Sequence, residues 1–148
     1  TLVAHIRGGD IYGPIGGKPS SVHHYYGQPP LVYYLSAWDA SKLPRLLVIS
    51  EDHNSPVLQM LNVASRFFAP GAISILYGHG FAEDLATIMC ARHLILSHSS
   101  LKRVFLLNAR LQHVYSYERI DPRPQTTFPS WIGSCTTRLH IVVGLVRE

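Results

Sequence analysis

The sequence predicts an α/β domain in which helices flank a Rossmann-like parallel sheet. Short, continuous apolar runs alternate with longer segments whose apolar side chains recur at three- and four-residue steps. The first pattern is typical of strands that are buried on both faces, and the second of amphipathic helices. Their regular alternation favours βαβ units and a parallel sheet. Charged residues make up only 15% of the chain, which fits a buried sheet better than a solvated array of helices.

The apolar runs and the helical periodicity place each element in turn. Strands are expected at residues 2–6, 45–50, 72–77, 93–97 and 112–116. Helices are expected after Pro29-Pro30, after Pro56, from Glu83-Asp84 to Arg92, and from Ser99-Ser100 to Leu107. The apolar spacing of the first three helices predicts their buried faces. These faces comprise Leu31, Tyr34, Leu35 and Trp38, then Val57, Leu58, Leu61, Ala64 and Phe68, then Leu85, Ile88 and Met89.

The domain is expected to span residues 1–120. Three prolines between residues 121 and 129 predict a linker or surface loop, so residues 121–148 are assigned to a linker and tail of uncertain structure. Residues 139–146 are apolar enough for a strand but have no obvious partner. Because the chain enters a strand-like run directly at Thr1, without an initiator Met, we expect it to be a piece of a longer protein.

Charge and missing motifs narrow the range of functions. The formal net charge of +4 favours an anionic ligand, but the basic residues are scattered, which disfavours binding to DNA or RNA. The chain lacks a Walker A motif, a GxGxxG after a strand, GxSxG, HExxH and Asp-x-Asp. A divalent metal is therefore not indicated. Cys90 and Cys135 have no metal-site spacing, and Cys90, within an apolar helical stretch, is expected to be a buried thiol.

Polar and ionisable residues gather where the predicted strands end. They occupy residues 7–10, 50–54, 78–84 and 97–102. Ligands of open parallel sheets bind at the carboxyl ends of the strands, near the first turns of the following helices. The sequence therefore predicts that a binding site lies at this edge of the sheet.

Arg7 follows the first strand and is flanked by Gly8 and Gly9. A guanidinium can hold two phosphate oxygens at once, and the two glycines allow a diphosphate to approach the backbone. His5 should share one face of the strand with Arg7, because side chains alternate. A structural ion pair between Arg7 and Asp10 is an equally good interpretation of this spacing.

The other strand ends carry similar alternatives. Ser97, Ser99 and Ser100 suit a phosphate at a helix start, although simple capping of the helix needs only one hydroxyl. Asp84 is favourable in the first turn of a helix without any ligand, or it can accept hydrogen bonds from the edge of a purine base.

Three segments resemble conserved stretches of the fucosyltransferase superfamily, which contains α1,2-, α1,6- and protein O-fucosyltransferases. The segment 5–10, His-Ile-Arg-Gly-Gly-Asp, is similar to the family's His-x-Arg-Arg-Gly-Asp. The segment 83–101 looks like its later motif, in which an Asp-led helix precedes a strand and a Ser-rich turn. The segment 47–52 is similar to its middle strand and acidic turn. The three occur in the family's order between Leu2 and Leu107.

This resemblance implies the C-terminal, nucleotide-sugar-binding half of a GT-B glycosyltransferase. Such an enzyme uses GDP-fucose as its donor, needs no metal, and transfers the sugar with inversion to the hydroxyl of a glycan or protein acceptor. The resemblance implies that Arg7 binds the β-phosphate, that His5 and Asp84 contact the guanine side, and that Ser99 and Ser100 meet the diphosphate. It also implies an N-terminal acceptor-side domain outside this chain and, in a eukaryote, the lumen of the Golgi or endoplasmic reticulum.

The chain departs from the family pattern at Gly8, which replaces the second arginine and removes half of the usual positive charge. The long segment 11–27 indicates a divergent branch. Asp10 and Glu51 are candidates for the general base, and Asp10 can instead hold Arg7 in place. Two alternatives stay open, namely a catalytically inactive nucleotide- or phosphate-binding module and another phosphate-dependent α/β enzyme such as a phosphatase.

Overall fold

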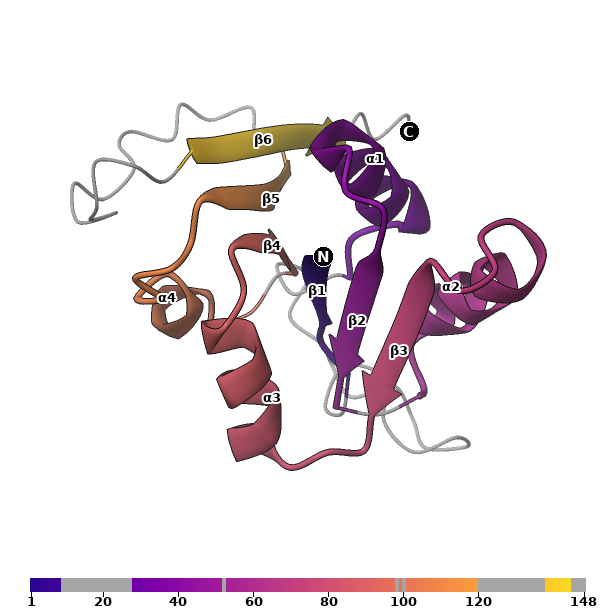
Figure 1. The fold of residues 1–148 in the computed structure, drawn as a ribbon, viewed down its shortest axis with the longest axis horizontal. Helices are drawn as coiled ribbons and strands as arrows, with labels where there is room; N and C mark the ends of the chain where they lie inside the picture. The colour runs from indigo at the N-terminus through magenta and orange to yellow at the C-terminus, as the bar shows by residue number, and fades with distance from the viewer. Residues whose placement is uncertain (9–27, 52, 98, 100, 120–137, 145–148) are drawn as a thin grey trace.

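A computed structural model describes residues 1–8, 28–51, 53–97, 99, 101–119 and 138–144. Six strands form one sheet in the order β3-β2-β1-β4-β5-β6, and every neighbouring pair is parallel (Figure 1). The strands are β1 (Leu2–Ile6), β2 (Leu46–Ser50), β3 (Ile73–Tyr77), β4 (His93–Leu96), β5 (His113–Arg119) and β6 (Arg138–Gly144). The helices are α1 (Leu31–Ser41), α2 (Pro56–Phe67), α3 (Phe81–Met89) and α4 (Lys102–Phe105).

The predicted α/β architecture, a parallel Rossmann-like sheet with flanking helices, is confirmed. The five expected strands correspond to β1–β5, each within a few residues of its expected bounds. The apolar stretch near the C-terminus forms β6, whose partner is β5 in a register that starts at His113↔Arg138. The predicted linker over 121–137 lies outside the described residues.

The order of the strands shows that the chain changes the side of the sheet to which it adds strands, and this change occurs next to β1. From β1 the chain winds outward to β2 and β3, and it then returns to add β4, β5 and β6 on the other side. Such a switch point opens a crevice at the carboxyl ends of the two central strands, and this is where open α/β sheets bind their ligands. Here the two strands are β1 and β4, so Arg7 and Ser97 follow the strands that flank the crevice.

Two hydrophobic cores lie on opposite faces of the sheet. Helices α1 and α2 cover one face, and α3 and α4 cover the other (Figure 1). Alternate residues of β1, β2 and β4 serve the two cores, as in β1, where Leu2 and Ala4 face α1 and α2 while Val3 faces α3 and α4. Burial on both faces explains why the sequences of these three strands are mainly apolar and not alternating.

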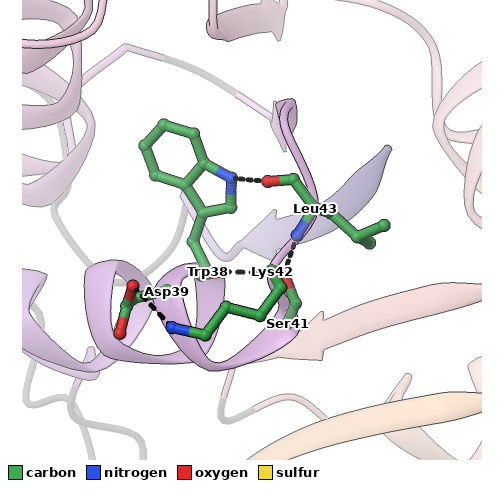
Figure 2. Close-up of polar contacts among 5 residues, drawn as sticks. All are labelled: Trp38, Asp39, Ser41, Lys42 and Leu43. Atoms are coloured by element: carbon green, nitrogen blue, oxygen red, sulfur yellow. Dashed lines mark hydrogen bonds and ion pairs between the residues drawn. The ribbon is translucent and has the colours of Figure 1, made fainter.

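Hydrogen bonds close the turn from α1 into β2 (Figure 2). The Trp38 indole Nε1 donates to the carbonyl oxygen of Leu43 at 2.8 Å, and the Ser41 hydroxyl donates to the carbonyl oxygen of Trp38 at 2.7 Å. The Ser41 Oγ also accepts from the Leu43 amide at 3.1 Å. Lys42 takes a left-handed conformation with φ 56° and its ammonium pairs with Asp39 at 3.1 Å. These bonds set where β2 begins.

The Tyr33 hydroxyl ties α1 to β4 and β5. Its single proton is shared between the carbonyl oxygens of Leu96 at 2.9 Å and of Tyr115 at 2.8 Å. The side chain is 2% exposed, and this burial raises the pKa of the hydroxyl above its ordinary value, so the proton is kept for donation. Tyr33 lies outside the predicted apolar stripe of α1, because periodicity alone does not show that a hydroxyl has buried acceptors.

Replacing Tyr33 with phenylalanine should lower the free energy of unfolding by about 1.5 kcal/mol, because two buried carbonyl oxygens lose their donor. Chemical denaturation followed by circular dichroism measures the change. Tyr77→Phe is the control, since the side chain of Tyr77 is 54% exposed and the change should stay within about 0.5 kcal/mol. Equal stability of the Tyr33→Phe variant and the parent would show that the hydroxyl is not a structural tie.

The structure corrects four local predictions. Helix α3 begins at Phe81, two residues before the acids that were expected to open it, and α4 is only one turn long. Phe68 ends the predicted buried stripe of α2 but is 84% exposed, because α2 stops at Phe67. Cys90 is exposed, because α3 ends at Met89 and Cys90 does not lie on the buried face of the helix. None of the helices in the described ranges is long and apolar enough to cross a membrane.

Candidate functional site

A cavity of about 400 Å³ opens at the carboxyl ends of β1 and β2, on the face of the sheet that α3 and α4 cover. This volume lies within the range of small-molecule sites. Polar residues enter it from the ends of β1 and β2, from the start of α3 and from the turn after β4, and α3 and α4 also supply apolar walls. The lining residues are His5, Arg7, Gly8, Glu51, His79, Phe81, Asp84, Leu85, Ile88, Ser99, Leu101 and Phe105.

The first group of lining residues comes from the end of β1. His5 and Arg7 both reach the cavity, as the alternation of side chains along a strand predicts. Gly8 also lines it and is buried, so no side chain stands between the cavity and the backbone at this position. The arrangement presents one guanidinium and an open stretch of backbone to a ligand, which suits phosphate oxygens.

His5 is held from two sides. Its Nδ1 lies 3.2 Å from the Oγ of Ser97, and its ring meets the ring of Phe105 edge-on with centroids 5.0 Å apart. Burial, with a smaller contribution from the positive charge of Arg7, lowers the pKa of His5 to about 4. The imidazole is therefore neutral at neutral pH, and Arg7 is the positive charge at this end of β1.

The second group of lining residues surrounds the start of α3. Gly78 has a φ of 74° and turns the chain sharply after β3, which brings His79 and Asp84 to the cavity. Burial raises the pKa of Asp84, His79 opposes this shift and Glu83 adds to it. The Glu83 carboxylate makes contacts with neighbouring residues of the chain instead. It accepts a hydrogen bond from the Gly80 amide at 3.3 Å and lies 3.5 Å from His79. Asp84 is thus the α3 carboxylate that the cavity offers to a ligand.

The third group comes from the turn after β4. Ser99 lines the cavity, and its Oγ accepts a hydrogen bond from the Leu101 amide at 3.2 Å. The hydroxyl therefore supports the turn before α4, as the capping alternative proposed, and its proton can still be donated to a ligand. Glu51, exposed at the end of β2, places a second carboxylate on the lining.

The structure brings together residues that are far apart in the chain. One cavity is lined by His5, Arg7, Gly8, Asp84 and Ser99. Ser97 does not line it but contacts His5. Three predicted site residues, Gly9, Asp10 and Ser100, lie outside the described residues.

The apolar walls were missed by sequence reasoning. Phe81 and Phe105 reach the cavity from α3 and α4, and both are ordinary apolar positions of their helices in the sequence. The Gly-His-Gly break at 78–80 was a usable signal for Phe81, because it marks the strand end that this residue follows. No comparable signal marks Phe105.

Fold and cavity together define the class of protein, an α/β protein with a ligand cavity beside the switch point of a parallel sheet. No family model matches the chain, and neither the curated proteins nor the solved structures contain a match. Within the described ranges no three His, Cys, Asp or Glu side chains are grouped as metal ligands. The predicted independence of metal stays a prediction.

Proposed function

We propose that this chain is the donor-binding domain of a glycosyltransferase that transfers fucose from GDP-fucose to an acceptor hydroxyl with inversion. One observation carries the proposal. Five residues assigned to a nucleotide-sugar site from the sequence motifs, His5, Arg7, Gly8, Asp84 and Ser99, line the same cavity although they come from three separate parts of the chain. The GT-B assignment and the identity of the sugar rest on the resemblance of these motifs to the fucosyltransferase superfamily.

The diphosphate is assigned to the end of β1. Arg7 provides a permanent positive charge that can hold two phosphate oxygens, and Gly8 lets the ligand approach the backbone. Ser99 adds a hydroxyl from the turn after β4. Negative charge builds on the diphosphate as it leaves, and a positively charged group that is already in position stabilises this charge without reorganisation.

The nucleoside is assigned to the side of the cavity formed by α3 and α4. Phe81, with 60% of its side chain exposed, offers a ring to a base or a ribose, and Leu85 and Leu101 supply further apolar surface. Asp84 lies on the same side and can accept hydrogen bonds from the base. Apolar walls with a few polar groups are the usual form of a site for such a ligand.

In the proposed transfer the acceptor oxygen attacks the anomeric carbon of fucose while the bond from that carbon to the β-phosphate oxygen breaks. GDP leaves with the electron pair of this bond, and the proton of the acceptor hydroxyl passes to a general base. Glu51 is the described carboxylate at the end of β2 that can take this proton, and Asp10 is the other candidate. The proposal assigns the stabilisation of charge to Arg7 and invokes no cofactor or metal.

The partners in this proposal are the nucleotide-sugar donor and a glycan or protein acceptor. An N-terminal domain outside this chain would supply most of the acceptor contacts. The lumen of the Golgi or endoplasmic reticulum is the proposed location in a eukaryote. These three points follow from the resemblance to the family.

A catalytically inactive nucleotide- or phosphate-binding module is the second candidate. The observation that favours it is Gly8, which lines the cavity where the related motif has a second arginine. Such a module would bind GDP without releasing fucose from GDP-fucose. Incubation with GDP-fucose, followed by chromatography of the nucleotide, distinguishes the two functions when acceptors are supplied.

Calorimetric titration with GDP, GDP-fucose, UDP and ADP tests the proposed ligand. We expect GDP and GDP-fucose to bind at least about tenfold more tightly than UDP or ADP, because a difference of about 1.4 kcal/mol at the base edge is sufficient for this ratio. Equal affinity for the four nucleotides, or no binding of any of them, would contradict the fucosyltransferase assignment. Binding of inorganic phosphate alone would favour a phosphate-dependent enzyme of another kind.

A further inference from the structure

Ser97 occupies a position from which it can act on the ligand through His5. It is the first residue after β4, its side chain is 4% exposed, and it is not among the residues that line the cavity. Its Oγ lies 3.2 Å from Nδ1 of His5, which does line the cavity. The contact joins β1 to β4 across the switch point, 92 residues apart in the chain.

The hydrogen bond determines which nitrogen of His5 can meet a ligand. A neutral imidazole has one N–H donor and one acceptor nitrogen, and the partner of one nitrogen sets the role of the other. Ser97 Oγ lies 3.2 Å from His5 Nδ1, and because a hydroxyl can donate or accept, the direction of this hydrogen bond and the tautomer of the ring go together. When the serine proton is donated to Nδ1, the ring proton resides on Nε2.

Packing holds the ring in this orientation. The ring of Phe105, 2% exposed, contacts the His5 ring at an interplanar angle of 69°. Burial keeps His5 uncharged, with a pKa of about 4, so the hydrogen-bonding pattern of the ring persists across the neutral range of pH. With Ser97 as the donor to Nδ1, the ring proton stays on Nε2, the nitrogen through which His5 would meet a ligand.

We propose that Ser97 is a positioning residue that holds His5 in the Nε2–H tautomer, so that the neutral imidazole donates a hydrogen bond to an acceptor oxygen of the bound nucleotide. The proposal rests on the proposed function for its ligand. It adds that His5 recognises an oxygen and not an N–H group, and that Ser97 acts without touching the ligand.

Nitrogen-15 NMR of the histidine rings tests the tautomer in the absence of ligand. At pH 7 the parent should show the Nε2–H pattern for His5, assigned by its loss in the His5→Gln variant. Ser97→Ala should shift His5 toward a mixture of tautomers, and Ser97→Thr, which retains a hydroxyl, should restore the parent pattern. An Nδ1–H pattern in the parent would overturn the proposal, and this measurement needs no Ser97 variant to fold.

GDP titration tests the consequence for binding. Ser97→Ala should weaken GDP binding by up to about tenfold, the ratio for complete loss of the hydrogen bond from His5, and Ser97→Thr should recover most of the affinity. In a His5→Gln background the same Ser97→Ala change should alter the GDP affinity by less than about twofold, because the imidazole through which Ser97 acts is then absent. Full loss in both backgrounds would mean that Ser97 contacts the nucleotide directly, and would overturn the proposal.

Ser50→Ala is the matched control. Ser50 is the last residue of β2, its side chain is 0% exposed, and its Oγ has no hydrogen-bond partner within the residues that the structure describes. Removing this hydroxyl should leave both the His5 tautomer and the GDP affinity unchanged. If the parent fails to bind GDP, the proposed function fails, while the NMR pattern of His5 still decides whether Ser97 positions the ring.

Discussion

Replacing Arg7 with alanine should weaken GDP binding about a hundredfold. A guanidinium that holds two phosphate oxygens makes two charge-assisted hydrogen bonds, and the loss of about 1.5 kcal/mol for each corresponds to that ratio. Arg7 lines the cavity beside Gly8, where no side chain can take over its role. Isothermal titration at a fixed, moderate ionic strength measures the change.

Two further variants make the result for Arg7 specific. Arg92→Ala removes an exposed guanidinium from the turn that precedes β4, at the opposite end of the strand from the cavity, and should leave the affinity for GDP unchanged. Arg7→Lys retains the charge but loses the two-pronged geometry, so an intermediate affinity is expected. Parent-like affinity in Arg7→Ala would remove Arg7 from the diphosphate site.

Acidification from pH 7 to pH 4 should cost the folded protein about 3 kcal/mol through His5 alone. Its pKa is lowered from 6.5 to about 4 in the folded chain, mainly by burial and also by Arg7. Between these two pH values His5 is protonated in the unfolded chain but not in the folded chain. The free energy of unfolding therefore decreases as the pH falls through this window. Above pH 6.5 both states are neutral at His5 and the contribution is flat. Each pKa unit corresponds to about 1.4 kcal/mol.

The His5→Gln variant isolates this contribution from that of the carboxylates and the other histidines. Urea unfolding of parent and variant at several pH values between 4 and 7 gives two curves of the free energy of unfolding against pH. The curves should diverge by about 3 kcal/mol over the window, with the parent falling more steeply. Parallel curves would show that His5 is not shifted, and would weaken the assignment of a neutral imidazole to the cavity.

The sequence predicted the positions of β1–β5 and of the first three helices from local patterns alone. Apolar runs marked the strands, since both faces of the sheet are buried. Where local patterns failed, the deciding interaction was distant in the chain. The partner of β6 is β5, a pairing between distant parts of the chain that no local pattern in residues 139–146 predicted. Similarly, Phe68 is exposed because α2 ends at Phe67, so that the helical periodicity no longer applies to it.

The kinds of residue at the candidate site were predictable from the sequence, but the contacts between these distant residues were not. Residues 7–10 and 97–102 stood out because polar side chains directly follow buried strands, and the carboxyl ends of parallel strands meet at one edge. The distinction between a residue that meets a ligand and one that acts behind it was beyond local sequence. Ser97 and Ser99 look equivalent in the chain, yet Ser99 lines the cavity and Ser97 bonds to His5.

By itself the sequence determined the class of fold and the strand ends that carry polar residues, and it predicted Arg7 as the residue that binds a diphosphate. The tertiary structure alone decided that β1 and β4 are neighbours, which brings Ser97 to His5 and closes the cavity with Phe105. The physical reason is that periodicity reports only which side of an element is buried. The neighbour that buries it, and the protonation state that this burial imposes on His5, depend on contacts between distant parts of the chain.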